Sequence, residues 1–420
     1  MLDVATIRTD PDLVRTALKN RGYSEGVLDE FLRIDNEWRK AVEESNQLKR
    51  LRNEVAEQIP TLEGVAKRTR IEEMKRVSDR IKELDARTSE LDSTRTEVVL
   101  NIPNIPHQSV PTGRSSDDNP IVKESGRPRV FDFHPKPHFE IGEELDIIDF
   151  ERGAKIAGSG FYVMKGDGAR LERALIGYML DLHLEQGYTE LFPPAVINRQ
   201  SVIGTGQYPN MKEDMYWIER DDLWLNPTAE VPVTNLHSDE IFEKIDLPIY
   251  YSAYLPSFRR EAGKHADTRG IIRVHQFNKV ELVMFTLPEN SFQELERLLH
   301  DAEAVVKGLE LPYRIVTLCT AELGFSSAKT YDIETHAPGI NSWLEVSSCS
   351  CFTDFQARRA RIKYRPEPHL RSEFVHTLNG SGIALPRTIA SLLENYQNKD
   401  GTVVIPKVLR SYMKGQEIIE

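Results

Sequence analysis

The apolar positions between about residues 26 and 100 follow one pattern. They recur at alternating spacings of three and four, with a few slips, and a short segment from Pro60 to Gly64 interrupts them once. This spacing is typical of a coiled-coil seam, and one break between two such helices predicts an antiparallel helical hairpin. With about 35 residues in each helix, the arm would extend roughly 50 Å.

Basic side chains lie on both helices near the break. They are Lys49, Arg50, Arg52, Lys67, Arg68 and Arg70. Antiparallel folding is expected to bring them to the same end of the arm. A solvated charged face is the ordinary interpretation for a coiled coil, and a basic tip that binds a phosphate backbone is the functional one.

The composition changes after the arm. Residues 106–140 are rich in Pro, Ser, Gly and Asp, which predicts a linker. From 141 to 420, short apolar runs and amphipathic helices follow one another without regular βαβ alternation. We therefore expect an α+β fold, with a helical arm at 1–105 and a domain at 141–420 built on an antiparallel sheet flanked by helices.

The segment 257–281 has the pattern of a β-hairpin with an unusual charge. Two extended arms, 254–261 and 270–283, flank a short polar loop. Arg259, Arg269 and Arg273 are predicted to lie in strand-like settings, in these arms or next to them. Arginines inside a strand pair need anionic partners, and the guanidinium fork suits phosphate and carboxylate. The alternative is that they pair with acids on a solvated sheet face.

Three further segments carry candidate chemistry. Thr228-Ala229-Glu230 places a hydroxyl and a carboxylate in a proline-flanked turn. Residues 345–348 end a strand with one carboxylate and two hydroxyls, which are suitable hard ligands for magnesium. Residues 378–387 form a glycine-bent strand that leads into a helix with Arg387 at its start. Each segment alone also fits an ordinary cap or bend.

Charge and cysteine content narrow the function classes. The net charge is −12, so a nucleic-acid partner must be bound by local basic patches. Three cysteines favour a reducing, cytoplasmic location, and Cys349-Ser-Cys351 is better explained as buried thiols than as half of a metal site. We expect no signal peptide and no membrane span, and the lack of a P-loop means that any nucleotide is bound differently.

Taken together, these segments closely resemble the seryl-tRNA synthetases, which are class II aminoacyl-tRNA synthetases. The resemblance covers nearly the whole chain, and it is carried by FRREAG, DTRGIIRVHQFNKVE, EVSSCS, TDFQARR, NGSGIALPRT and ENYQ. It implies a class II catalytic domain behind the helical arm. The region 187–194 is similar to the first class motif, which forms the dimer interface in this family and implies a homodimer.

The resemblance also implies roles for individual residues, with ATP and Mg²⁺ as cofactors. The implied L-serine contacts are Thr228, Ala229, Glu230, Glu281 and Ser381. The implied ATP contacts are Arg259, Arg260, Glu261, Arg273, Val274, Phe277, Glu345, Val346, Ser347, Ser348 and Arg387. Of these residues, Arg259, Glu281 and Arg387 match the catalytic positions, and Glu345 and Ser348 match the magnesium ligands.

The implied activity is serine–tRNA ligation: ATP activates L-serine to seryl-adenylate, and the seryl group passes to tRNA(Ser), with tRNA(Sec) as a second candidate acceptor. The basic residues of the arm would bind the tRNA. Three departures from the family pattern stand out: a loop one residue shorter at 263–267, Trp343-Leu344, and Cys351-Phe352. They leave open a specialised paralogue that resists a serine-mimicking inhibitor or supplies a biosynthetic pathway, and seryl transfer to a non-tRNA carrier.

Overall fold

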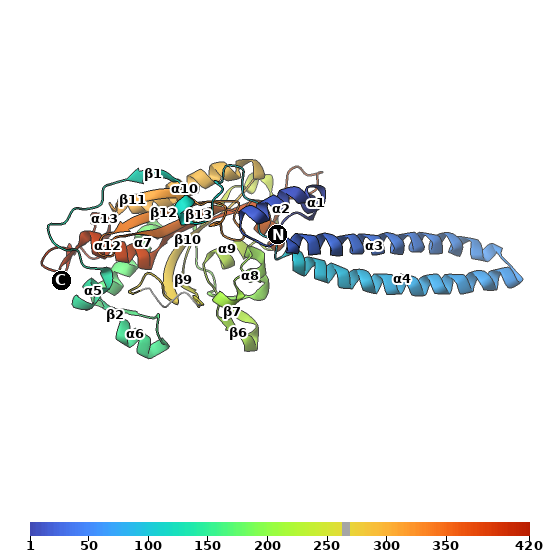
Figure 1. The fold of residues 1–420 in the computed structure, drawn as a ribbon, viewed down its shortest axis with the longest axis horizontal. Coiled ribbons are helices and arrows are strands. Elements are labelled where there is room, and N and C mark those ends of the chain that lie inside the picture. The colour runs from blue at the N-terminus through green and yellow to red at the C-terminus, as the bar shows by residue number, and fades with distance from the viewer. Residues whose placement is uncertain (263–268) are drawn as a thin grey trace. The chain divides into compact units, whose positions relative to one another are not determined.

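The computed structural model describes residues 1–262 and 269–420, and the chain folds into two compact units (Figure 1). The smaller unit consists of Leu2–Lys19 and Tyr23–Pro103, and the larger unit consists of Met1, Asn20–Gly22 and Asn104–Glu420. The loop at 263–267, where a residue is missing relative to the family pattern, lies outside the described residues.

The smaller unit is a helical hairpin, as the apolar spacing predicted. Two short helices, α1 (Val4–Thr9) and α2 (Pro11–Asn20), precede the long α3 (Gly26–Gln58). A 3₁₀ turn, η1 (Ile59–Thr61), then leads into α4 (Gly64–Val99), which lies beside α3 (Figure 1). Because each helix buries only a narrow seam, most of its surface stays in water.

Ion pairs between α3 and α4 show where the basic residues lie along the hairpin. Glu44 accepts from Arg80 at 2.9 Å, and Lys49 contacts Asp85 at 2.8 Å. Residues 49–52 therefore lie across from the middle of α4, whereas 67–70 lie close to the turn. The six basic residues thus spread along the distal half of the hairpin and do not form a single cluster at its end.

A buried carboxylate joins the helices of the smaller unit near its base. The side chain of Asp35 is 1% exposed, and it accepts hydrogen bonds from Arg8 at 2.6 and 2.8 Å and from Arg95 at 3.1 Å. Burial by itself raises the pKa of Asp35, but the hydrogen bonds from the two arginines outweigh it and hold the pKa below its ordinary value. Asp35 is thus ionised and ties α1, α3 and α4 together.

The larger unit is built on a mixed sheet. In the described residues its main sheet has eight strands, in the order β1-β11-β12-β13-β16-β10-β9-β4. All neighbouring pairs are antiparallel except β4 and β9. The bounds are β1 (Ile121–Ser125), β11 (Tyr313–Thr317), β12 (Lys329–Ala337), β13 (Ser342–Cys351), β16 (His376–Ala384), β10 (Gln276–Thr286), β9 (Ile249–Phe258) and β4 (Thr189–Leu191).

Helices and short strands surround this sheet. The helices are α5 (His138–Glu144), α6 (Phe150–Ala157), α7 (Gly166–Glu185), α8 (Arg199–Thr205), α9 (Glu230–Asn235), α10 (Ser291–Gly308), α11 (Phe355–Ala360), α12 (Leu385–Tyr396) and α13 (Lys407–Arg410). The short strands are β2 (Ile148–Asp149), β3 (Val163–Met164), β5 (Val196–Asn198), β6 (Trp217–Ile218), β7 (Leu223–Leu225), β8 (Ile241–Glu243), β14 (Lys363–Arg365), β15 (Glu373–Phe374), β17 (Val403–Val404) and β18 (Ile418–Ile419).

Strand β10 separates the main core from the face where the candidate site lies. Side chains alternate along a strand, so Val280, Leu282 and Met284 enter the core formed with α7, α10 and α12. Val283 and Phe285 point the other way, into the smaller core that contains residues of α9 and α11. Towards the start of the strand, the residues of this second face line a cavity instead of a core.

The arginine hairpin differs from its prediction at the ends of its strands. The placement of Arg259, Arg269 and Arg273 inside the strands is wrong, because β9 ends at Phe258 and β10 begins at Gln276. One more backbone bond, from Arg259 N to His275 O, continues the pairing. The N–H groups of Arg260 and Ala262 then bond to Asp214 instead, so the two arms separate, and Arg259 and Arg273 reach the cavity.

The segment 106–140, expected as a linker, is part of the larger unit. It contributes β1, which pairs antiparallel with β11 at one edge of the main sheet, and the first residues of α5. Its high proline and glycine content concealed one short, mostly exposed strand. Among the described residues, no helix is both long and apolar enough to cross a membrane.

We predict that Asp35→Asn destabilises the helical hairpin by roughly 1–3 kcal/mol, because a neutral amide cannot compensate the arginines around it. Hydrogen exchange of α3 and α4 in the full chain measures the change. Asp79→Asn is the control, since Asp79 pairs with Lys82 on the surface with a side chain 60% exposed. The control should change stability by about 0.5 kcal/mol or less, and equal effects of the two substitutions would contradict the prediction.

Candidate active site

Two adjoining hollows open on the second face of the main sheet, and they share Arg259, Lys279, Glu345 and Ser381. The first is also lined by Glu261, Ile272, Arg273, Val274, Phe277, Ala384, Pro386 and Arg387. The second also contains Thr228, Glu230, Ser348 and Asn379, together with Gln207 and Ser326. One hollow is therefore rich in arginine, and the other in carboxylate, hydroxyl and amide groups.

Glu281 lies beneath the second hollow and is completely buried. Thr228 donates to its Oε2 at 3.0 Å and Asn379 donates to its Oε1 at 2.8 Å, while Lys279 forms a close ion pair with it. A buried carboxylate is stable only when it is paired and hydrogen-bonded. These contacts gather the turn before α9, strand β10 and strand β16 around one charge.

A second carboxylate, Glu230, lies at the start of α9 and faces the same hollow. Its side chain accepts from Gln356 Nε2 at 2.6 Å. Burial, reinforced by the nearby charge of Glu281, raises the pKa of Glu230 to about 7. This carboxyl group is therefore poised between its neutral and ionised forms near neutral pH, and a cationic ligand would favour the ionised form.

The arginines line the first hollow from three elements. Arg259 follows β9, its guanidinium carbon is 5.2 Å from the centre of the Phe277 ring, and its Nε donates to Pro227 O. Arg273 pairs with Glu261 at 2.7 Å. Arg387, in the first turn of α12, pairs with Glu345 at 3.1 Å and donates to its carbonyl oxygen at 2.9 Å. These guanidinium groups could bind a polyphosphate.

Besides Glu281, which lies beneath the second hollow, four residues implied by the resemblance do not line either hollow with their side chains. Ala229 and Val346 belong to apolar cores, and Ser347 donates to Ser381 O at 2.6 Å. Arg260 is exposed and donates to Glu213 O at 3.1 Å. Contacts of these residues with a ligand would have to come from their backbone or, for Arg260, from a different side-chain rotamer.

A bulge in β13 brings Glu345 and Ser348 to the same side of the strand. In a regular strand, residues three apart face opposite sides. In the register of β13 against β12, Glu345 lies opposite Glu334 and Ser347 lies opposite Ile333, so Val346 has no opposing residue. The extra residue shifts the alternation, and Glu345 and Ser348 both line the second hollow.

The oxygens beside this bulge suit a divalent cation. Asp332 is opposite Ser348 in the neighbouring strand, and its Oδ1 is buried without a hydrogen-bond partner. Burial, reinforced by Glu345, raises the pKa of Asp332 well above its ordinary value. In the described part of the chain, no three His, Cys, Asp or Glu side chains form a metal-binding cluster. The fit therefore rests on two carboxylates and a hydroxyl, which suits an ion that retains waters, such as Mg²⁺.

Among the polar residues that the sequence-based reasoning missed, four make contacts central to the site. They are Lys279, Asp332, Gln356 and Asn379. Strand alternation could have identified Lys279, because it lies two residues before Glu281 and must share its face. Gln356 and Asn379 lie within quoted motifs, but their contacts depend on how distant segments pack. Nothing in the local pattern around Asp332 distinguishes it from an ordinary strand carboxylate.

Comparisons with known proteins match both units. The seryl-tRNA synthetase N-terminal domain family covers residues 1–106, and the class II core domain family of the G, H, P, S and T synthetases covers 216–396. A serine–tRNA ligase of Carboxydothermus hydrogenoformans is 54% identical over 417 residues, which are 98% of each chain. The chain belongs to the seryl-tRNA synthetase family. The resemblance inferred from its motifs is confirmed, and so is the α+β class II fold.

Two further members of the seryl-tRNA synthetase family, from other organisms, match the whole chain. A serine–tRNA ligase of Methanosarcina barkeri is 53% identical, with 100% of this chain and 99% of the relative covered. The crystal structure of the Pyrococcus horikoshii seryl-tRNA synthetase complexed with ATP superposes with a TM-score of 0.96 at 38% identity, and it covers 100% of this chain and 99% of that one. These full-length matches do not favour the specialised-paralogue or carrier alternatives.

Two departures from the seryl-tRNA synthetase pattern are mostly in packing positions. The rings of Trp343 and His336 lie 5.2 Å apart, and the Arg314 guanidinium carbon is 4.8 Å from the centre of the Trp343 ring. Leu344 and Cys351 belong to the main core, whereas Phe352, which is 5% exposed, lines the second hollow. Packing therefore explains Trp343, Leu344 and Cys351, and Phe352 adds an apolar surface to the wall of the second hollow.

We predict that Glu230→Gln removes a pH-dependent loss of stability in the ligand-free chain. The pKa of Glu230 in the folded chain, about 7, lies above the ordinary value of 4.5. The protonated carboxyl group therefore stabilises the folded chain at low pH, and this contribution is lost as pH rises through 7. Between pH 5 and pH 8, the wild-type unfolding free energy should fall by roughly 2 kcal/mol relative to the variant. Urea unfolding at each pH measures the difference.

Glu219→Gln is the matched control, because Glu219 is exposed in the 3₁₀ turn before β7. This variant should follow the wild type at every pH. A pH-independent difference between Glu230→Gln and the wild type would contradict the prediction.

Proposed function

We propose that the chain is a serine–tRNA ligase that forms seryl-adenylate from L-serine and ATP and then transfers the seryl group to tRNA(Ser). One observation carries the proposal. In this member of the seryl-tRNA synthetase family, the hollow rich in carboxylates and hydroxyls adjoins the arginine-rich hollow, and Arg259 lines both. A small zwitterion in one would therefore place its carboxylate beside a phosphate in the other.

L-Serine occupies the second hollow in this proposal. The ammonium group binds Glu230, which its positive charge keeps ionised. Thr228, Glu281 and Ser381 surround the rest of the amino acid, with the backbone of Ala229 beneath it. The serine hydroxyl is selected by hydrogen bonding, because an analogue without it would leave buried polar groups unpaired.

ATP occupies the first hollow. Its adenine stacks on Phe277, and its adenosine contacts Arg260, Glu261 and Val274. Arg273 and Arg387 bind the triphosphate, and Arg259 bridges the serine carboxylate and the α-phosphate. The pairs of Arg273 with Glu261 and of Arg387 with Glu345 support these placements, because each holds a guanidinium group at the cavity wall.

Glu345 and Ser348 would hold Mg²⁺ at the bulge of β13, beside Val346 and Ser347. The ion would neutralise phosphate charge. The unpartnered Oδ1 of Asp332 supports a cation at this place.

The reaction needs alignment more than proton transfer. A carboxylate oxygen of serine attacks the α-phosphorus, and the bond to pyrophosphate breaks. A ribose hydroxyl at the tRNA end then attacks the activated carbonyl, and AMP leaves. The serine carboxylate is ionised at neutral pH, so Arg259 and Arg387 contribute by orienting the reactants and by neutralising charge.

The tRNA would bind along the helical arm, residues 1–105, ahead of the catalytic domain at 141–420. Lys49, Arg50, Arg52, Lys67, Arg68 and Arg70 supply phosphate contacts, and tRNA(Sec) is a second candidate acceptor. Lys49 pairs with Asp85 and Arg70 pairs with Glu73, whereas Arg50 and Arg68 are exposed. A binding surface that extends along the distal arm fits this arrangement.

A homodimer through 187–194 completes the proposal. β4 lies at the edge of the main sheet, and Phe192 directly after it is 82% exposed. A large exposed aromatic beside an open strand edge is typical of an interface.

The three cysteines are free and buried, which supports a reducing, cytoplasmic location.

We predict that Arg259→Ala lowers serine-dependent ATP–pyrophosphate exchange at least about 10³-fold, because it removes a charge that serves both substrates in the transition state. Exchange across an amino-acid panel, with serine as the preferred substrate in the wild type, is the measurement. Arg220→Ala is the control, since Arg220 is exposed in the same 3₁₀ turn as Glu219. Near-normal exchange in Arg259→Ala would refute the assignment.

Removing residues 30–96 should spare serine activation and abolish charging of purified serine tRNA. The arm lines neither hollow of the candidate site, whereas tRNA binding depends on its basic residues. Pyrophosphate exchange and aminoacylation of the same preparation measure the two steps separately. Equal loss of both would refute a separate role for the arm. Serine activation without charging by the full chain would point to a different acceptor.

A further inference from the structure

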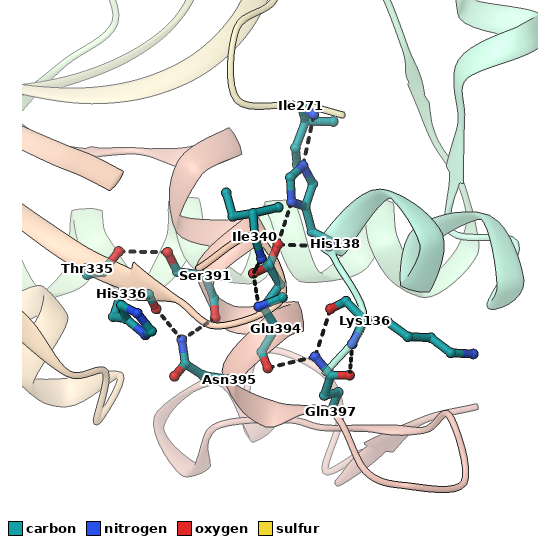
Figure 2. A network of polar contacts seen from close by, with 11 residues as sticks. Lys136, His138, Ile271, Thr335, His336, Ile340, Ser391, Glu394, Asn395 and Gln397 are labelled. Carbon is teal, nitrogen blue, oxygen red and sulfur yellow. Dashed lines mark hydrogen bonds and ion pairs between the residues drawn. The ribbon is translucent and has the colours of Figure 1, made fainter. Parts of the chain in front are cut away.

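A buried histidine–carboxylate pair lies behind the arginine-rich hollow. His138 begins α5 and Glu394 lies near the end of α12, and both side chains are fully buried. His138 Nδ1 is 2.7 Å from Glu394 Oε1 (Figure 2). Its Nε2 faces the backbone N–H of Ile271 at 3.2 Å. That N–H can only donate, so Nε2 accepts, and Nδ1 carries the proton that it donates to Glu394.

Glu394 is the centre of this network. Oε1 also accepts from the backbone N–H of His138 at 2.9 Å. Oε2 accepts from the N–H groups of Gly339 and Ile340 at 2.8 and 3.2 Å. Four donors on one carboxylate fix α5 and the turn between β12 and β13 to α12 (Figure 2). Strand β13, which follows that turn, carries Glu345.

The first residues of α5 hold the return arm of the arginine hairpin, residues 269–273. The guanidinium carbon of Arg269 is 4.7 Å from the centre of the Phe139 ring. Gly270 has φ +83° and packs so closely that a Cβ there would lie 2.1 Å from His138 Nε2. Together with the Ile271 bond, three successive residues of the arm contact His138 or Phe139.

Helix α12 therefore holds the same arm at two points. Arg387 Nε donates to Ile272 O at 3.4 Å from the first turn of the helix. Glu394 lies seven residues later, which is about two helical turns, and reaches Ile271 through His138. Arg273, the next residue of the arm, lines the first hollow with Arg387.

We propose that His138 and Glu394 are a positioning pair for the ATP reaction, which hold the return arm against α12 so that Arg273 and Arg387 face the same triphosphate. The inference rests on the proposed ATP site. The serine pocket has separate supports in Thr228 and Asn379, which bond Glu281 directly. Loss of the pair should therefore weaken the use of ATP more than that of serine.

Two substitutions at residue 138 separate its two hydrogen bonds. The amide nitrogen of His138→Asn can replace Nδ1 and keep the bond to Glu394, but it leaves Ile271 N–H without an acceptor. The amide oxygen of His138→Gln can replace Nε2 and keep the Ile271 bond, and the backbone N–H of residue 138 still donates to Glu394, so the arm stays linked to α12. We expect His138→Asn to raise the KM for ATP in pyrophosphate exchange about tenfold with the KM for serine within about twofold, and His138→Gln to recover most of the loss.

Thr335→Val is the matched control. Thr335 Oγ1 forms a buried 2.7 Å hydrogen bond with Ser391 Oγ on α12, away from the hairpin (Figure 2). This variant should lower the thermal unfolding midpoint about as much as His138→Asn and leave the KM for ATP within about twofold of the wild type. Hydrogen exchange of a peptide covering 269–275 should rise in His138→Asn alone.

Gly270→Ala tests the same contact from the opposite side if His138→Asn does not fold. Its methyl group would push the arm from His138 and leave the pair with Glu394 intact, so the same selective rise in the KM for ATP is expected. Equal changes in the two KM values, or no difference from Thr335→Val, would overturn the proposal. Wild-type protein without serine-dependent exchange would instead refute the proposed function itself.

Discussion

The architecture of the site depends on one constraint, which is that the buried charge of Glu281 must be compensated. A fully buried carboxylate is too costly to leave unpaired, so the fold must bring donors to it from separate elements. Thr228 comes from the turn before α9, Asn379 comes from β16, and Lys279 comes from β10, the strand that also carries Glu281. The contacts that satisfy this charge also form the wall of the pocket proposed for serine, so in this proposal folding and substrate recognition share the same atoms.

The two hollows have different mechanical supports. The hollow proposed for serine is built from side chains on the sheet and from the turn before α9, which Thr228 ties to Glu281 on β10. The hollow proposed for ATP uses Arg259 and Arg273, which lie beyond the strand ends where backbone pairing has stopped, and contacts from α5 and α12 hold the arm that carries Arg273. This difference is the reason that we expect the pair of His138 and Glu394 to affect the use of ATP more than that of serine.

Much of the fold could be predicted from local patterns. The alternating spacing of residues such as Leu84 and Leu91 predicts the hairpin, and the alternation of β10 shows which side chains share a face. Long-range geometry could not be predicted. Cross-helix pairs such as Lys49–Asp85 depend on the register of α3 and α4, the edge strand β1 has few apolar contacts, and the Glu394 network joins segments more than 250 residues apart. Motifs identify which residues matter, but only packing shows that Val346 points into the core.

The bulge at Val346 has a consequence for how this gene can change. It acts as a phase shift in the side-chain alternation of β13, and it alone lets Glu345 and Ser348 meet on one side. Gain of one more codon between them would invert every following residue, and would move Cys349 and Cys351 out of the core and Ser348 and Ser350 into it. Loss of Val346 would instead remove the bulge, because Glu345 and Ser347 are already opposite successive residues of β12, and would leave the faces of the following residues unchanged. Substitutions can accumulate along this strand, as Trp343 and Leu344 illustrate, whereas an added residue would disturb every position after it.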